Sequence, residues 1–140
     1  MKKLIELPKE KLVEIIEKLY SHLIKEPKYN IYSKAFFIEY FKQTFEIYKR
    51  YKNLKISILL FKFDADCINL IQKNLRKSDL VAKYDNAFVI LLFETGEMGT
   101  YKVKNKLEKI LSQKGIAVKI SLSESVKDII EEIESKIKIY

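Results

Sequence analysis

The sequence predicts an α/β (α+β) sandwich, in which helices cover the faces of a mixed β-sheet that includes a β-hairpin. The first observation is a nearly continuous apolar run, Ile56–Phe63, which is typical of a strand buried on both faces. The second is the alternation of helical and strand patterns along most of the chain. The third is a pair of apolar runs on either side of Asp85 and Asn86, which is typical of a hairpin.

The first expected helix covers Leu7–Glu26, where apolar residues recur at helical spacing. A proline near each end of this stretch supports these limits. The short apolar seam suits two arrangements: pairing with a second copy of the chain, or docking on its own domain. We therefore divide the chain into an N-terminal helix over residues 1–26, which packs or dimerises through residues 7–26, and a domain over residues 27–140.

A second helix is expected to begin near Ser33, a suitable N-cap, and to end at about Tyr51. Aromatic side chains recur along one face of this helix: Phe37, Tyr40, Phe41, Phe45 and Tyr48. Because these aromatic rings are interleaved with Lys34, Lys42 and Lys49, they would suit stacking on nucleic-acid bases. We favour burial of the aromatic face in the core, because a stripe at helical spacing is typical of a packed helix.

The rest of the chain continues the alternation of helices and strands. A short helix is expected at Cys67–Asn74, and a longer one at roughly Thr100–Gln113. A strand with one more exposed face should follow over Ile116–Leu122. The last helix should begin at about Ser125, because Ser125 and Asp128 have the spacing of a capping box.

The composition fits a single folded domain. The chain has 140 residues, of which 48% are hydrophobic and 33% are charged. No apolar run approaches the roughly 20 residues that a membrane span needs, so we expect no membrane contact. The single cysteine, Cys67, excludes an internal disulfide bond, and the first residues lack the apolar core of a signal peptide. We therefore expect a cytoplasmic protein.

The net charge of +8 leaves two interpretations open. A basic protein is attracted to phosphates and to anionic lipids. Lysines that merely cover a solvated surface give the same charge. We favour the solvated surface, because the lysines are spread along the chain rather than packed in a run.

The stretch around the hairpin resembles a known family. Arg76–Tyr84 reads RKSDLVAKY, followed by Asp85, Asn86, Ala87 and Phe88 and then by an apolar strand. It is similar to the R-x-S-D-L-V-A-R-x-G-G-D-E-F signature of the GGDEF domain, the bacterial signalling fold that joins two GTP molecules into cyclic di-GMP. Upstream, Glu26–Lys34 resembles the D-P-L-T-G-L-x-N-R entry of that family. The resemblance runs from Glu26 to the C-terminus and implies a shortened GGDEF/nucleotidyl-cyclase-like fold.

The chain departs from the family signature where the family's chemistry is carried out. Asp85 and Asn86 occupy the turn in place of the glycines, and Ala87 stands where an acidic metal ligand precedes Phe88. Two registers are open for the family's other metal ligands, the D-x-D at the end of the first strand.

The first register places Lys62 and Asp64 at the two aspartates, whereas the second places Asp64 and Asp66 there. The family's guanine-recognition loop has no counterpart after Asp66. We therefore expect a catalytically inactive, degenerate GGDEF-like domain with no enzyme activity, no metal and no cofactor.

A second family feature is kept. The resemblance places Arg76 and Asp79 at the R-x-x-D site with which the family binds its product. One interpretation is a regulatory domain that binds cyclic di-GMP through these two residues. The other is a structural junction, in which Asp79 satisfies nearby backbone groups. The remaining candidate partners are a second copy of the chain, another protein, and nucleic acid bound by the same fold.

Overall fold

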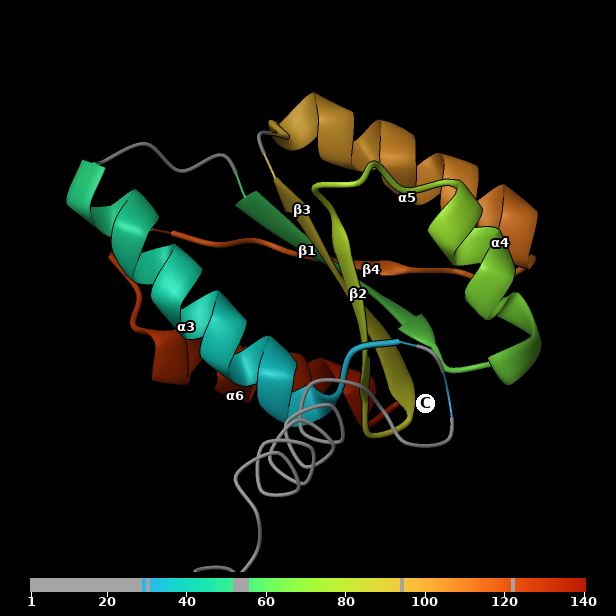
Figure 1. Cartoon of the computed structure of the whole chain (residues 1–140), viewed down its shortest axis with the longest axis horizontal. Coiled ribbons are helices and arrows are strands. Elements are labelled where there is room, and N and C mark those ends of the chain that lie inside the picture. The colour runs from blue at the N-terminus through green and yellow to red at the C-terminus, as the bar shows by residue number, and fades with distance from the viewer. Residues whose placement is uncertain (1–28, 30, 52–55, 94, 122) are drawn as a thin grey trace, which may run out of the picture.

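Helices cover both faces of a four-stranded sheet in the computed structural model (Figure 1), which describes residues 29, 31–51, 56–93, 95–121 and 123–140. In chain order the elements are α3 (Lys34–Tyr51), β1 (Ile56–Lys62), the 3₁₀ helix η1 (Ala65–Cys67), α4 (Ile68–Lys73), β2 (Leu80–Tyr84), β3 (Ala87–Phe93), α5 (Glu97–Leu111), β4 (Ile116–Val118) and α6 (Val126–Ile137). Helices α3 and α6 lie on one side of the sheet, and α4 and α5 lie on the other (Figure 1). The predicted α/β (α+β) sandwich is confirmed.

The strand order is β2-β3-β1-β4, and all three neighbouring pairs are antiparallel. The expectation of a mixed sheet was wrong in this detail, because among the described residues parallel pairing is confined to the isolated bridge between Tyr32 and Ala82. The cause is the order β1-α4-β2-β3-α5-β4, a split βαβ arrangement. The hairpin reverses the chain, so that β3 is antiparallel to β1. Helix α5 then brings the chain back across the sheet, so that β4 is also antiparallel to β1.

The central strand β1 is buried on both faces, as its apolar run predicted. Ile58 and Leu60 point toward α3 and α6, whereas Leu59 and Phe61 point toward α4 and α5. This alternation follows from the two-residue period of a strand. The sheet therefore separates two apolar cores, and both of its faces are covered by helices.

Helix α3 begins where the sequence predicted. The Ser33 Oγ accepts a hydrogen bond from the Phe36 backbone N–H at 3.1 Å, which caps the helix. Three aromatic side chains of the predicted stripe are fully buried in the core: Phe37, Phe41 and Phe45. Tyr40 lies at the margin of the stripe, 38% exposed, with its ring against Phe93.

The later boundaries were predicted less closely. Helix α5 begins at Glu97, three residues before the predicted start, with Gly96 as its N-cap. Strand β4 ends at Val118, well before the predicted Leu122, which lies outside the described residues. The Ser121 N–H donates to Glu124 at 3.0 Å, so local hydrogen bonds beyond β4 turn the chain toward α6. The predicted capping box of α6 is confirmed.

The predicted N-terminal helix Leu7–Glu26 lies outside the described residues. Dimerisation through residues 7–26 and the division of the chain at residue 27 therefore stay predictions. No helix in the described part of the chain has the length and apolar character needed to cross a membrane.

Candidate functional site

The hairpin turn joins β2 to β3 through two residues, Asp85 and Asn86. Tyr84 pairs with Ala87 across the turn, and Asp85 adopts a left-handed conformation with φ of 54°. Aspartate tolerates this conformation better than most residues. The hairpin predicted around Asp85 and Asn86 is confirmed. The Asn86 carbonyl accepts a hydrogen bond from the Phe63 N–H at 2.8 Å. This bond holds the turn against the end of β1.

The end of β1 places Lys62 directly opposite Ala87 in the β1–β3 ladder. Ala87 is fully buried and has no side-chain oxygen, whereas the Lys62 side chain is exposed. The Gln113 amide pairs with both backbone groups of Lys62, at 2.9 Å and 3.0 Å. A cation and an alanine therefore face each other next to the turn.

Asp64 and Asp66 follow β1 and are both exposed. The Asp64 carboxylate caps η1 by accepting a hydrogen bond from the Asp66 N–H at 3.0 Å. Burial of the nearby Cys67 thiol, and then the charge of Asp64, raise the thiol pKa, which disfavours a reactive thiolate. Within the described residues, no three Asp, Glu, His or Cys side chains gather in a way that could hold a metal ion.

Two helices fix the turn from the other face of the sheet. The Lys34 ammonium lies 3.1 Å from the Asp85 carboxylate and 4.6 Å from the centre of the Tyr84 ring. The Tyr84 hydroxyl donates to Glu134 of α6 at 2.6 Å. Burial raises the pKa of Tyr84, and the Glu134 carboxylate raises it further. These contacts surround a hollow of about 380 Å³ at the turn.

Sequence reasoning missed the Tyr84–Glu134 contact, because the two residues lie 50 positions apart. The available signal was a tyrosine at the end of an apolar strand, whose hydroxyl needs a partner when the ring is buried. Lys34 is one of the lysines interleaved with the aromatic stripe and ends the stretch that resembles the family entry, but neither pattern indicates its contact with Asp85.

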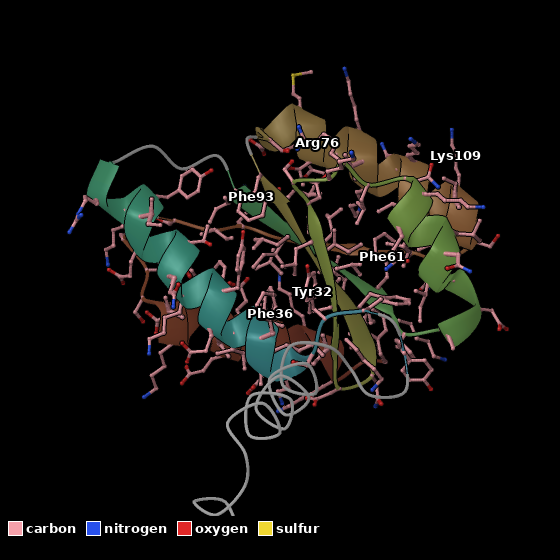
Figure 2. The ribbon with its side chains drawn as sticks, in the orientation of Figure 1. Tyr32, Phe36, Phe61, Arg76, Phe93 and Lys109 are labelled. Carbon is pink, nitrogen blue, oxygen red and sulfur yellow. The ribbon has the colours of Figure 1, made fainter. Side chains whose placement is uncertain are left out.

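Arg76 and Asp79 lie just before β2 and thus at the opposite end of the hairpin from the turn. Figure 2 shows Arg76 at that end. The five residues of β2 separate them from the turn by about 16 Å. The fold therefore brings Lys62, Ala87 and the turn together, but it does not bring Arg76 and Asp79 to them.

Arg76 and Asp79 bind each other. The Asp79 carboxylate is only 3% exposed and accepts hydrogen bonds from the Arg76 Nη2 at 3.2 Å and Nε at 3.3 Å. It also accepts from the backbone N–H groups of Arg76 and Phe93. Arg76 Nη2 further donates to the Phe93 carbonyl and, at 2.7 Å, to the Thr95 hydroxyl. The pair, which we call the Arg76–Asp79 latch, ties the loop before β2 to the end of β3.

A second hollow, of about 310 Å³, lies beside the latch. Thr95 lines it and is also a hydrogen-bond partner of Arg76. The buried Thr100 hydroxyl lies 2.8 Å from the Ser57 hydroxyl and donates to the Gly96 carbonyl at 2.9 Å. Among the described residues that line the hollow, Thr95 provides the link to the latch, and Arg76 itself, whose side chain is 56% exposed, is not one of them.

Comparison with solved structures shows the same fold in a diguanylate cyclase. The chain is similar to SiaD from Pseudomonas aeruginosa, solved in complex with its activator SiaC, with a TM-score of 0.60 and 12% sequence identity. The match covers 90% of this chain but 62% of the SiaD chain, so the present chain spans less than two thirds of that protein. No model of a known protein family matches the sequence, and no curated protein does so either. At this identity the likeness establishes a diguanylate-cyclase-like, GGDEF-like fold.

We expect Arg76→Ala to lower the free energy of unfolding by about 1.5 kcal/mol, because it removes the hydrogen bonds of the latch. This value is the lower end of the range for hydrogen bonds to a charged group. We choose it because the Arg76 side chain is half exposed and its charge is therefore screened by solvent. Urea unfolding measures this change. A double-mutant cycle with Asp79→Ala should give a coupling of about 1 kcal/mol.

Lys77→Ala, at the exposed neighbouring position, is the matched control and should change stability by less than about 0.5 kcal/mol. Strict additivity of the Arg76 and Asp79 substitutions would contradict the latch.

The raised pKa of Tyr84 predicts a loss of stability in alkali. When the pKa of a tyrosine is higher in the folded than in the unfolded protein, the neutral tyrosine stabilises the folded state. This stabilisation is complete below the ordinary tyrosine pKa near 10 and is lost as the pH rises above 10. Tyr84→Phe should therefore lower stability by about 1 kcal/mol at pH 8 and flatten the decline above pH 10. Urea unfolding between pH 8 and pH 11 measures both effects, and an unchanged alkaline slope would show that Tyr84 does not cause it.

Proposed function

We propose that this chain is a catalytically inactive regulatory or interaction domain on a GGDEF-like fold. The observation that carries the proposal is the cross-strand pair of Lys62 and Ala87. In the family resemblance, Ala87 takes the place of an acidic metal ligand beside the turn. Two acidic residues that bind the same cations must lie close together. Because Lys62 lies directly opposite Ala87, the strand pairing favours the register in which Lys62 replaces the first aspartate of D-x-D.

The residues beside the turn do not suit the two cations that the family requires. Divalent cations such as Mg²⁺ need several oxygen ligands, and two-metal phosphoryl transfer needs carboxylates that hold both ions. Ala87 supplies no oxygen, and the Lys62 ammonium repels a cation. The Asp85 carboxylate is already neutralised by Lys34. We therefore derive no catalytic step through metal ions at this position.

The connection after β1 supports the same proposal. Only Phe63, Asp64 and the three-residue η1 separate β1 from α4. The family's guanine-recognition loop would have to stand in this connection, and the chain is too short to form it here.

The more specific form of the proposal is a receptor for cyclic di-GMP at Arg76. The Arg76 side chain is 56% exposed, so a phosphate or a guanine edge could approach its guanidinium from the solvent. Asp79 is buried and already accepts four hydrogen bonds. A ligand that binds both Arg76 and Asp79 must therefore break the hydrogen bonds between them. Its binding would then be coupled to the loss of the contacts that hold the end of β3.

An interaction role has separate support. The structural neighbour SiaD was solved in complex with its activator SiaC, so a protein with this fold does bind a protein partner. For the present chain, the partner stays a proposal.

The inactive form predicts that the purified protein makes no cyclic di-GMP from GTP with Mg²⁺ or Mn²⁺, even at high protein concentration. Product analysis by chromatography measures this, with an active diguanylate cyclase as the positive control. Turnover that Asp64→Asn or Asp66→Asn abolishes would overturn the proposal.

The receptor form predicts saturable binding of cyclic di-GMP in a calorimetric titration, with at least a tenfold weaker affinity for Arg76→Ala. Lys77→Ala is the matched control, because it removes a neighbouring exposed charge and leaves the latch intact. Circular dichroism establishes that both variants are folded. Equal binding by Arg76→Ala would place the ligand elsewhere, and no binding by the unmodified protein would exclude the receptor form.

A further inference from the structure

The two helical layers of the sandwich carry different charge. Helices α3 and α6 hold six basic and six acidic residues, whereas α4 and α5 hold five basic and two acidic residues. The charge of the α3 and α6 helices is therefore balanced, whereas the charge of the α4 and α5 helices is positive. The two acids of α5 are also placed apart from most of its lysines: Glu97 begins the helix, and Glu108 accepts a hydrogen bond from the Gly115 N–H.

Five exposed lysines form the basic surface, which we call the α4–α5 basic face: Lys73, Lys77, Lys102, Lys106 and Lys109. Within the described part of the chain, none of them has an ion-pair partner, whereas Lys34 and Lys136 on the other layer are paired with Asp85 and Glu132. Figure 2 places Arg76 and Lys109 on the α4–α5 side of the sheet. The positive charge of this face is therefore free to meet an outside partner.

The fold gathers these lysines from separate parts of the sequence. Helices α4 and α5 pack on the same face of the sheet, with Ile71 and Leu107 in one core. On α5, Lys102, Lys106 and Lys109 follow the four- and three-residue spacing of one helix face, over a rise of about 10 Å. Their spread along the sequence favoured an ordinary solvated surface, but the fold places α4 and α5, which carry most of them, on the same face of the sheet.

We propose that the α4–α5 basic face binds single-stranded nucleic acid through its phosphates. The row of lysines on α5 can contact successive phosphates of a single strand. Tyr101, which is half exposed beside Lys102, provides a ring on which a base can stack. Bases cannot stack on the sheet, because helices cover both of its faces. A membrane suits the face less well, since α4 and α5 bury their apolar sides against the sheet rather than presenting them to a bilayer.

The proposal does not rest on the regulatory function. None of the five lysines is hydrogen-bonded to Arg76, to Asp79 or to the hairpin turn within the described residues. Failure of cyclic di-GMP binding and failure of nucleic-acid binding are therefore separate outcomes.

The experiment measures the fluorescence anisotropy of labelled 20-nucleotide oligo(dT) and oligo(U) with the full chain, between 20 and 200 mM NaCl. Lys102, Lys106 and Lys109 are changed together to glutamine. The expected result is at least a tenfold loss of affinity at low salt, with the slope of log affinity against log salt reduced by about 2, because each phosphate contact on a single strand contributes about 0.7.

The matched control changes three exposed lysines of the opposite layer, Lys42, Lys49 and Lys127, to glutamine and removes the same total charge. It should retain affinity within about threefold of the unmodified protein. Equal losses in the two triple variants would show that net charge alone drives binding. No binding at 20 mM NaCl, or binding only to vesicles that contain anionic lipid, would overturn the proposal.

Discussion

The antiparallel pairing of β1 with β3 is the constraint on which the rest of the structure depends. All seven residues of each strand are paired, and most of their side chains are buried on one face of the sheet or the other. A one-residue shift in the register of this pairing would move the side chains of the shifted strand to the opposite face of the sheet. The apolar side chains of each core would then face the helices of the other core. This ladder fixes Lys62 opposite Ala87 at one end, and it fixes Phe93 at the other end, where Arg76 binds its carbonyl.

The two ends of the hairpin differ in what their charged groups do. At the turn, the Asp85 carboxylate is paired with Lys34, and both side chains are substantially exposed. At the other end, the Asp79 carboxylate is buried and satisfied by two backbone N–H groups as well as by Arg76. A surface pair contributes little to stability, whereas a buried carboxylate demands its partners. Of these two carboxylates, Asp79 thus contributes more than Asp85 to holding the segment that resembles the family signature.

Local patterns predicted the features that depend on nearby residues. The Ser33 cap, the Ser125–Asp128 capping box and the buried aromatics of α3 follow from spacing within a few residues. Contacts between distant segments could not be read in the same way. The Tyr84–Glu134 hydrogen bond, the closure of the R-x-x-D pair on Phe93 and the gathering of lysines on α4 and α5 all require the fold to be known. The direction of β3 against β1 likewise depends on the whole chain path.

The amide of Gln113 also protects an open edge. Strand β4 pairs with Ile58, Leu59 and Leu60, so in the described part of the chain no strand lies beside β1 beyond Leu60 on that side. Unpaired edge groups invite strand addition from another molecule, which begins aggregation. Gln113 occupies both backbone groups of Lys62 with its side chain and so acts as a one-residue substitute for the missing strand. At Lys62, a single side chain thereby occupies the backbone groups at which a second chain would otherwise find a template.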